Sequence, residues 1–269
     1  MAKDDVLVKV DAVWQKLGGN QILEGVSFAI VDRVRPNCIT GQIVGLLGPS
    51  GVGKTRLIRL IAGLDLPDRG VITGFDGKPL QPGETGVVFQ NYPLLRHHTV
   101  LGNLMVAGAA AGLSHGEAMN RARQLLERFG MSARADYYPA QLSGGQRQRV
   151  AIAQQLVRQC RLVLMDEPFS GLDPATLDAT IRLLIEVANM DELNTIAVVT
   201  HDIRSALTAC DTLFVLGRDR DAEGRILSGA KIQRTYDLVE MGLAWQEHVE
   251  TLPAFIAVEK EIKTGFARL

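Results

Sequence analysis

The stretch QIVGLLGPSGVGKTRLIRLIAGL, residues 42–64, decides the fold. Its first six residues form a mostly apolar run, which predicts a buried strand, and TRLIRLIAGL has the periodicity of a helix. Similar apolar runs predict strands at 161–165, 195–200 and 212–217. Because these short strands alternate with helical segments, the sequence indicates an α/β protein built on a sheet.

The loop between that strand and that helix, GPSGVGKT, has the pattern of a phosphate-binding P-loop. Successive backbone N–H groups of such a loop point into one concavity, and glycine adopts the dihedral angles that this requires. We expect Lys54 to reach the β- and γ-phosphates of a nucleotide and the Thr55 hydroxyl to bind Mg²⁺. A chance glycine turn would give the pattern in about one per cent of chains of this length, so nucleotide binding is strongly favoured. The expected nucleotide-binding residues are Gly48, Pro49, Ser50, Gly51, Val52, Gly53, Lys54 and Thr55.

Two carboxylates, Asp166 and Glu167, follow the predicted strand RLVLM. Ligands of such sheets bind at the carboxyl ends of the strands. We expect Asp166 to hold the Mg²⁺ shell and Glu167 to polarise the attacking water as a general base. A solvated acidic strand end is the alternative, and the P-loop upstream makes it much less favoured.

The region between Tyr92 and Gln159 is rich in Ala, Leu, Arg and Gln and has no strand candidate, which predicts a helical insertion. Within it, Ser143, Gly144 and Gly145 of LSGGQ have the pattern of a second helix start that faces a phosphate. The alternative is an ordinary Ser-Gly loop that caps a helix. By composition, LSGGQ arises by chance in fewer than about one chain in a thousand of this length.

With these motifs the chain resembles the nucleotide-binding subunit of an ATP-binding cassette transporter, from about Val6 to Leu216. The resemblance implies ATP and Mg²⁺ as cofactors and a P-loop NTPase core, a RecA-like and mostly parallel sheet. It also implies an N-terminal antiparallel β subdomain and an inserted α-helical subdomain. The expected layout is one cassette domain over 1–269, with the core in 1–90 and 160–217, the helical part in 91–159, and a C-terminal hairpin and helical tail in 218–269.

The resemblance assigns further site residues. LSGGQ is similar to the signature motif, of which Ser143, Gly144, Gly145 and Gln146 would contact the γ-phosphate of ATP held by a second ATP-binding subunit. That subunit would be a copy of this chain or a close relative. Gln90 in VVFQ matches the glutamine that touches Mg²⁺ or the attacking water, and His201 matches the switch histidine that contacts the γ-phosphate. Asp173 in SGLD would cap a helix and face the partner subunit.

Three segments depart from the family pattern or carry no family motif. The aromatic residue that stacks on adenine would align near Leu17, so Trp14 is expected to take its place, with a core tryptophan as an equal alternative. The segment Val31–Cys38 is longer than usual and predicts an extended hairpin or loop. Beyond Leu216, RDRD at Arg218–Asp221, followed by Ala222-Glu223-Gly224, predicts a charged turn between two strands, and the chain from Tyr236 onward has helical texture.

Composition limits the partners. The chain has 269 residues, with Lys+Arg 29 against Asp+Glu 30 and a formal net charge of -1, which argues against a nucleic-acid binder. Its three separated cysteines indicate reduced thiols. The start lacks the apolar block of a signal peptide, and the apolar centre Leu104–Leu113 is shorter than the about 20 residues of a membrane-spanning helix.

The function expected from the resemblance is ATP hydrolysis at the cytoplasmic side of the inner membrane, coupled to solute import through separate integral-membrane permease subunits. GFDGKPLQPGETGVVFQ and YPAQLSGGQRQR look most like the branch that imports nitrate, sulfonate and taurine. Two alternatives stay open: a lipid-transport ATPase of the bacterial envelope, and a soluble cassette protein without a transport role.

Overall fold

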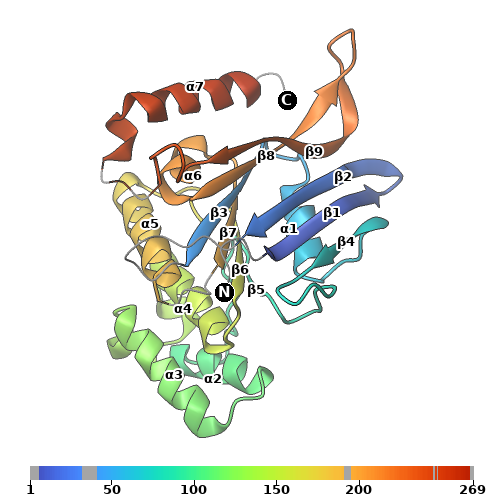
Figure 1. Cartoon of the computed structure of the whole chain (residues 1–269). Helices are drawn as coiled ribbons and strands as arrows, with labels where there is room; N and C mark the ends of the chain where they lie inside the picture. Colours follow the sequence, from blue (N-terminus) through green and yellow to red (C-terminus); the bar gives the residue numbers. More distant parts are fainter. Residues whose placement is uncertain (1–5, 32–40, 191–194, 245, 247, 267–269) are drawn as a thin grey trace.

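The computed structural model describes residues 6–31, 41–190, 195–244, 246 and 248–266. Within these ranges, nine strands form one sheet in the order β4-β1-β2-β9-β8-β3-β7-β6-β5 (Figure 1). The strands are β1 (Val6–Leu17), β2 (Asn20–Val31), β3 (Gln42–Leu47), β4 (Arg69–Thr73), β5 (Gly86–Val88), β6 (Leu162–Asp166), β7 (Thr195–Thr200), β8 (Thr212–Arg220) and β9 (Ile226–Asp237). The predicted strands at 42–47, 161–165, 195–200 and 212–217 are therefore confirmed as β3, β6, β7 and β8, within a few residues at their ends.

The sheet joins a parallel half to an antiparallel half. Strand β3 pairs in parallel with β7 and β8, and β6 pairs in parallel with β5 and β7. Strand β1 pairs antiparallel with β2 and β4, and β9 pairs antiparallel with β8. The α/β fold with antiparallel N-terminal strands is thus the one expected from the sequence. The hairpin β8–β9 connects the two halves, because β9 also pairs with β2.

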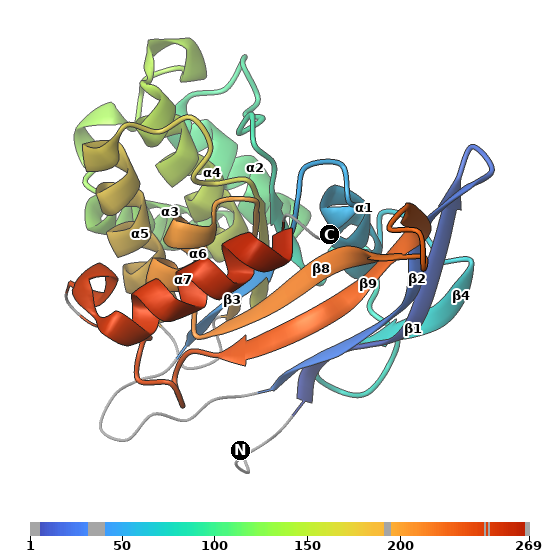
Figure 2. The ribbon, with the colours of Figure 1, turned by 90° about the horizontal axis from the view of Figure 1, so that it is seen from above.

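The described helices lie on both faces of the parallel strands and at one end of the molecule (Figures 1 and 2). They are α1 (Lys54–Ile61), α2 (Val100–Ala110), α3 (His115–Arg128), α4 (Gly144–Val157), α5 (Pro174–Ala188), α6 (Ile203–Ala209) and α7 (Pro253–Phe266), with short 3-10 turns at Ser132–Arg134, Pro139–Gln141 and Val249–Thr251. Helices α2 and α3 occupy the end of the molecule away from α7. None of the helices in the described ranges combines the length and the apolar character needed to cross a membrane.

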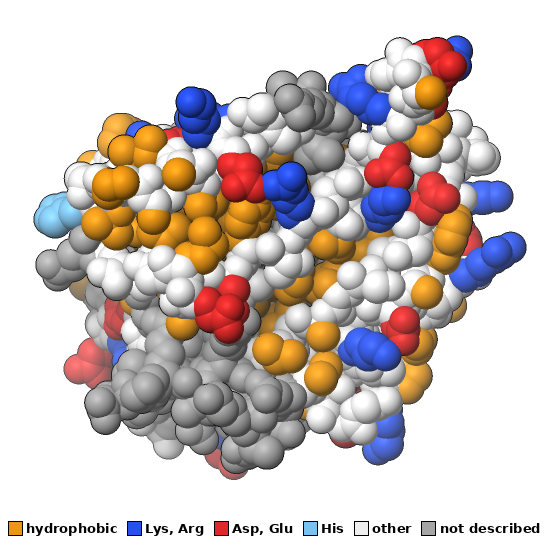
Figure 3. All heavy atoms as spheres, turned by 45° about the horizontal axis from the view of Figure 1, so that its top comes forward, with side chains coloured by type: hydrophobic (Ala, Val, Ile, Leu, Met, Phe, Trp, Pro, Cys, Tyr) orange, Lys and Arg blue, Asp and Glu red, His pale blue; other side chains and the backbone are white. Residues whose placement is uncertain are grey.

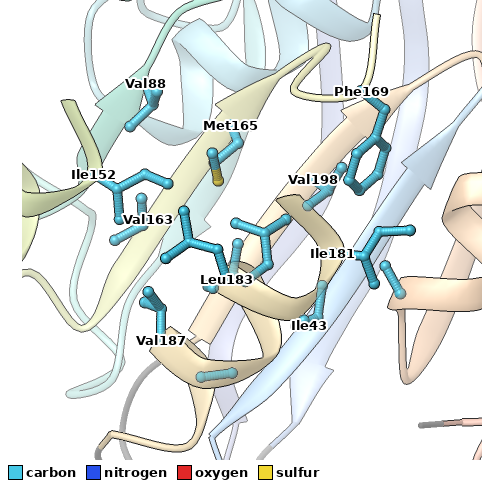
Figure 4. Close-up of a cluster of buried hydrophobic side chains, with 14 of the residues drawn as sticks. Ile43, Val88, Ile152, Val163, Met165, Phe169, Ile181, Leu183, Val187 and Val198 are labelled. Carbon is cyan, nitrogen blue, oxygen red and sulfur yellow. The ribbon is translucent and has the colours of Figure 1, made fainter. Parts of the chain in front are cut away.

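Alternate residues of each central strand enter two hydrophobic cores, as the period of two in a strand requires. One core joins β3, β6 and β7 to α4, α5 and α6, and Figure 4 shows Val163, Met165 and Val198 pointing toward Ile181 and Leu183 of α5. The other core joins the opposite faces of these strands to α1 and to the antiparallel strands. The sheet edge that carries the loops after the strands is therefore held by packing on both faces.

The C-terminal region differs from the sequence expectation in two respects. The predicted charged turn starts too early, because β8 continues to Arg220. The chain turns at Asp221–Arg225 before β9, where Asp221 accepts backbone N–H bonds from Glu223 and Arg225, so a turn between two strands is confirmed there. The helical texture assigned from Tyr236 was wrong at its start, because β9 continues to Asp237 and α7 begins only at Pro253. Helix α7 buries Phe255, Val258 and Ile262 against the sheet domain.

Candidate nucleotide-binding site

Four neighbouring parallel strands end at one edge of the sheet and bring most of the predicted site residues together. In the order β3-β7-β6-β5, the residues that follow or end them are the P-loop, His201, the pair Asp166–Glu167, and Gln90. The carboxyl ends of parallel strands are where open α/β sheets bind their ligands. The site is therefore assembled by the order of the strands from segments that lie far apart in the sequence.

The P-loop enters α1 without any side-chain cap. Helix α1 begins at Lys54 after Gly53, whose φ of 118° is open to glycine but strained for other residues. A Cβ atom on Gly53 would also lie 3.0 Å from the Ile22 side chain of β2, so a side chain there would force β2 to shift slightly. The first turn of α1 contains no acidic residue and no side-chain cap, which leaves its backbone N–H groups for an anion.

Lys54 is folded into this loop. Its Nζ donates to the carbonyl oxygens of Gly48 and Pro49, at 2.8 and 3.1 Å, and lies 3.6 Å from Oε1 of Glu167. Only 6% of the side chain is exposed, and this burial lowers the pKa of Lys54, while the neighbouring Glu167 carboxylate opposes the shift. The ammonium group is thus held at the mouth of the loop by contacts that a phosphate can replace.

Thr55 and Asp166 present oxygen atoms side by side. The Thr55 hydroxyl donates to Oδ2 of Asp166 at 3.0 Å. Burial raises the pKa of Asp166, and the hydrogen bond from Thr55 acts in the opposite direction. A hydroxyl and a carboxylate beside a phosphate site are the oxygen ligands that Mg²⁺ prefers, so these residues fit a magnesium nucleotide.

Glu167 stands apart from Asp166 although the two are consecutive. Its backbone has a φ of 50°, unusual for a residue with a side chain, and its N–H donates to the Val199 carbonyl at 2.8 Å. Nδ1 of His201 lies 2.9 Å from Oε2 of Glu167, and the Thr200 hydroxyl donates to the same oxygen at 3.3 Å. The strained turn thus directs the Glu167 carboxylate toward Lys54, Thr200 and His201.

The LSGGQ segment lies in a different pocket. Ser143 caps α4 through a reciprocal pair of bonds, in which its Oγ accepts from the Gln146 N–H and Oε1 of Gln146 accepts from the Ser143 N–H. With Gly144, Gly145 and Gln146 it lines a pocket of about 600 Å³ shared with Asp173 and α5. The described lining of this pocket contains no P-loop residue. The signature segment and the P-loop of one chain therefore do not meet in one cavity.

Comparison with known proteins assigns the family. The family described as ABC transporter matches residues 31–170. The sulfate/thiosulfate import ATP-binding protein CysA of Mesostigma viride is 36% identical over 234 residues, which cover 86% of this chain and 63% of that protein. The chain belongs to the ABC transporter family.

Other ABC relatives agree with this assignment. The methionine import ATP-binding protein MetN of Geobacillus kaustophilus is 37% identical over 231 residues, covering 82% of this chain and 65% of that protein. The ABC chain thus spans less than two thirds of the length of these two importer proteins. Among solved structures, cbiO1 from Clostridium perfringens, described as part of the ABC transporter complex cbiONQ, has a TM-score of 0.73 and 28% identity, covering 88% of this chain and 91% of that one.

Two predicted residues of the ABC chain are not joined to the phosphate-binding cluster by the contacts described. Gln90 is exposed, and within the described part of the chain the structure gives it no hydrogen bond to Asp166 or Glu167. Asp173 caps α5 by accepting from the Thr176 N–H and hydroxyl, and these bonds lower its pKa.

Trp14 lies in the antiparallel part of the cassette. It lines a surface pocket of about 360 Å³ with Lys16, Gln21, Asp68 and Arg69, and its ring packs beside Gly25. Among the described residues of that pocket none belongs to the P-loop. Trp14 is half-buried rather than enclosed in the core, and its stacking on adenine stays a prediction. The segment Val31–Cys38 lies outside the described residues apart from Val31.

Three residues with contacts in or beside the site were not singled out from the sequence. Thr200 contacts the Glu167 carboxylate, Arg218 Nη2 donates to the Gly51 carbonyl at 3.2 Å, and buried Gln148 donates to the Pro168 carbonyl at 3.3 Å. Gln148 also accepts from the Thr180 hydroxyl at 3.3 Å. Thr200 could have been found, because it directly precedes His201 at a strand end. Arg218 and Gln148 gave no local signal, since their partners lie far away in the sequence.

Proposed function

We propose that this cassette binds MgATP at a dimer interface and hydrolyses ATP to drive solute import through separate permease subunits. The cluster of Lys54, Thr55, Asp166, Glu167 and His201 at one sheet edge carries the proposal. It combines a phosphate-binding loop, two oxygen ligands for Mg²⁺ and a carboxylate positioned as a base. The relatives named as import ATP-binding proteins support the same function.

In this proposal the chain's own residues have separate tasks. Lys54 exchanges the Gly48 and Pro49 carbonyls for phosphate oxygens, while the uncapped start of α1 binds the phosphates through its backbone. Thr55 and Asp166 would hold Mg²⁺, which neutralises phosphate charge when bound. Glu167 accepts a proton from the water that attacks the γ-phosphorus, and the bond to the β-phosphate oxygen breaks to leave ADP and phosphate.

His201 has a role on the other side of Glu167. In the structure it contacts the general base directly, and 49% of its side chain is exposed at the strand end. We infer that it moves toward the γ-phosphate when nucleotide binds and positions that phosphate for attack. The contact of Lys54 with Glu167 would be released at the same time, because Lys54 turns to the phosphates. Nucleotide binding would thus free the Glu167 carboxylate for the water.

The separate signature pocket supports a head-to-tail dimer. Ser143 and the N-terminus of α4 have the geometry of an anion site but lie away from this chain's own P-loop. A second ATP-binding subunit, a copy or a close relative, would bring its nucleotide to that site. Two ATP molecules would then lie between the two P-loops and the two signature segments.

Replacement of Gly145 tests the dimer. A Cβ on Gly145 meets nothing within 4 Å, so Gly145→Asp is expected to fold normally while placing a carboxylate where the partner's γ-phosphate would lie. In a Glu167→Gln background, which retains ATP, light scattering should show an ATP-dependent dimer that Gly145→Asp abolishes. ATP binding to the monomer should not change.

Gly116→Asp is the matched control, because a Cβ there also meets nothing within 4 Å and Gly116 lies in the first turn of α3, away from the signature. It should dimerise like the parent. An intact ATP-dependent dimer in the Gly145→Asp protein would contradict the head-to-tail arrangement.

The finer features of the function are also proposals. We infer a peripheral position at the cytoplasmic face of the inner membrane, where permease subunits would meet the helical end of the cassette. The motifs that look like nitrate, sulfonate and taurine importers favour that branch, whereas the curated relatives named above import sulfate/thiosulfate or methionine. These relatives support import in general and give the narrower assignment no support.

Purification from membranes tests the transport role. An affinity-tagged cassette expressed from its native locus is expected to co-purify with a polytopic membrane subunit after mild detergent extraction, identified by mass spectrometry. A complex made only of soluble proteins would reject the transport role and favour a soluble cassette protein. Recovery with a lipid-binding partner in place of a solute-binding one would favour the envelope lipid transporter.

A further inference from the structure

A groove of about 700 Å³ lies between α7 and the β8–β9 hairpin, outside the predicted ATP-binding motifs. Figure 2 shows α7 alongside this hairpin, and Figure 3 shows acidic, basic and hydrophobic side chains close together on the same face. Buried Val215 and Ile262 and the rings of Tyr236 and Phe266 contribute an apolar lining. This volume lies within the range of about 300–1,000 Å³ that is typical of small-molecule sites.

Basic side chains outnumber acidic ones in the groove. Its lining includes Arg218, Arg220, Arg234 and Lys260 but only Asp219 and Glu261 as acids. Both acids already have partners within the protein. Asp219 pairs with Lys231 and accepts from Gln233 at 3.0 Å, and these bonds lower its pKa. Glu261 pairs with Arg234 and accepts from the Tyr236 hydroxyl at 3.0 Å.

Two of the basic groups keep donors that the described protein does not satisfy. Nε of Arg218 is buried without a hydrogen-bond partner in the structure. The Lys260 ammonium is exposed and forms no ion pair within the described part of the chain. A buried donor without a partner is costly, and a ligand that accepts from it removes that cost. The groove therefore has an apolar lining and unused positive charge.

We propose that this groove binds a small amphipathic anion, with an apolar body against Ile262 and Phe266 and a carboxylate, phosphate or sulfonate group near Arg218 and Lys260. Arg218 also donates to the Gly51 carbonyl of the P-loop at 3.2 Å. Because Arg218 lines the groove, an anion paired with its guanidinium group restrains the same side chain that holds the loop. Less ordering of that side chain then remains for ATP to impose. Occupation of the groove thus strengthens ATP binding, a step that rests on the proposed function.

Binding is tested with 8-anilinonaphthalene-1-sulfonate, whose rings and sulfonate match the groove and whose fluorescence rises in apolar surroundings. Without nucleotide, Lys260→Glu should raise its dissociation constant by about tenfold or more, because a charge-assisted contact becomes a repulsive one. Lys260→Arg should keep the wild-type affinity. Lys263→Glu is the matched control: it makes the same change on an exposed lysine of α7 that does not line the groove.

Equal affinity in the Lys260→Glu and wild-type proteins overturns the site, and so does an equal loss in the Lys263→Glu protein. Thermal unfolding of each variant confirms that the fold is retained. Because this test contains no nucleotide, its result does not depend on the proposed ATPase activity.

The coupling is tested by calorimetric titration of ATP into the Glu167→Gln protein with and without saturating dye. ATP should bind about fivefold more tightly with the dye, within the usual range of coupling between two sites. In the Arg218→Ala protein the two ATP affinities should be equal. Weaker ATP binding with the dye, or coupling that persists in Arg218→Ala, overturns the link to the P-loop. A failure of ATP to bind even without dye would instead contradict the proposed function.

Discussion

Glu167→Gln is expected to slow ATP hydrolysis by about 10²–10⁴-fold while ATP binding stays intact. The amide keeps the size of the side chain and its contacts with Thr200 and His201, but it cannot accept the proton of the attacking water. The strained φ of 50° at this residue should tolerate glutamine as it tolerates glutamate, because the two side chains have the same shape. Phosphate release and ATP affinity are to be measured on the same preparation.

Glu186→Gln is the control for this result. Glu186 lies on α5 and forms an exposed pair with Arg128, so its replacement should leave turnover within about twofold of wild type. Wild-type turnover in the Glu167→Gln protein would reject Glu167 as the general base. The dimer trapped by ATP in that variant also provides the starting material for the Gly145→Asp experiment.

Lys54→Ala is expected to weaken ATP binding by at least about tenfold, because a phosphate loses a charge-assisted contact. The Lys54 amine is already desolvated, since only 6% of its side chain is exposed, so its exchange from carbonyl to phosphate oxygens adds little desolvation cost. ATP affinity is to be measured by calorimetry, together with the free energy of unfolding without nucleotide.

The unfolding measurement separates a binding defect from a folding defect. Lys78→Ala, at an exposed lysine paired with Asp76, should leave both ATP affinity and stability unchanged. Normal ATP affinity in the Lys54→Ala protein would contradict the assignment of the P-loop.

The sequence predicted those parts of the fold and site that depend on local pattern. Strands β3, β6 and β7 are continuous apolar runs, and the site residues at their ends occur in contiguous motifs. A second strand was expected after the charged turn, but the residues of β9 were not assigned, because the strand contains charged and glycine residues and is only half-buried in a hairpin. Its bounds depend on pairing with β8 on one side and with β2 on the other. Strand β2 is distant in the sequence, so its pairing with β9 leaves no local pattern.

The contacts of Arg218 and Gln148 could not be predicted for a related reason. Arg218 reaches Gly51 only because β8 lies beside β3 in the sheet, and the two residues are 167 positions apart. Gln148 follows the signature by a few residues and has an ordinary helical context, so nothing in the sequence indicates that its amide is buried. In both cases the order of the strands and the packing of helices decide the partner.

Gln148 has a consequence for the timing of the two hydrolysis reactions. Its hydrogen bonds to the Pro168 carbonyl and Thr180 tie the helix of the signature to the residue directly after Glu167. In the proposed dimer that helix faces the partner's ATP, whereas Glu167 acts on the chain's own ATP. A shift of the helix when one nucleotide is cleaved therefore reaches the base that serves the other. The two ATP sites of such a dimer would not hydrolyse ATP independently, and the rate at each site would depend on the nucleotide state of the other.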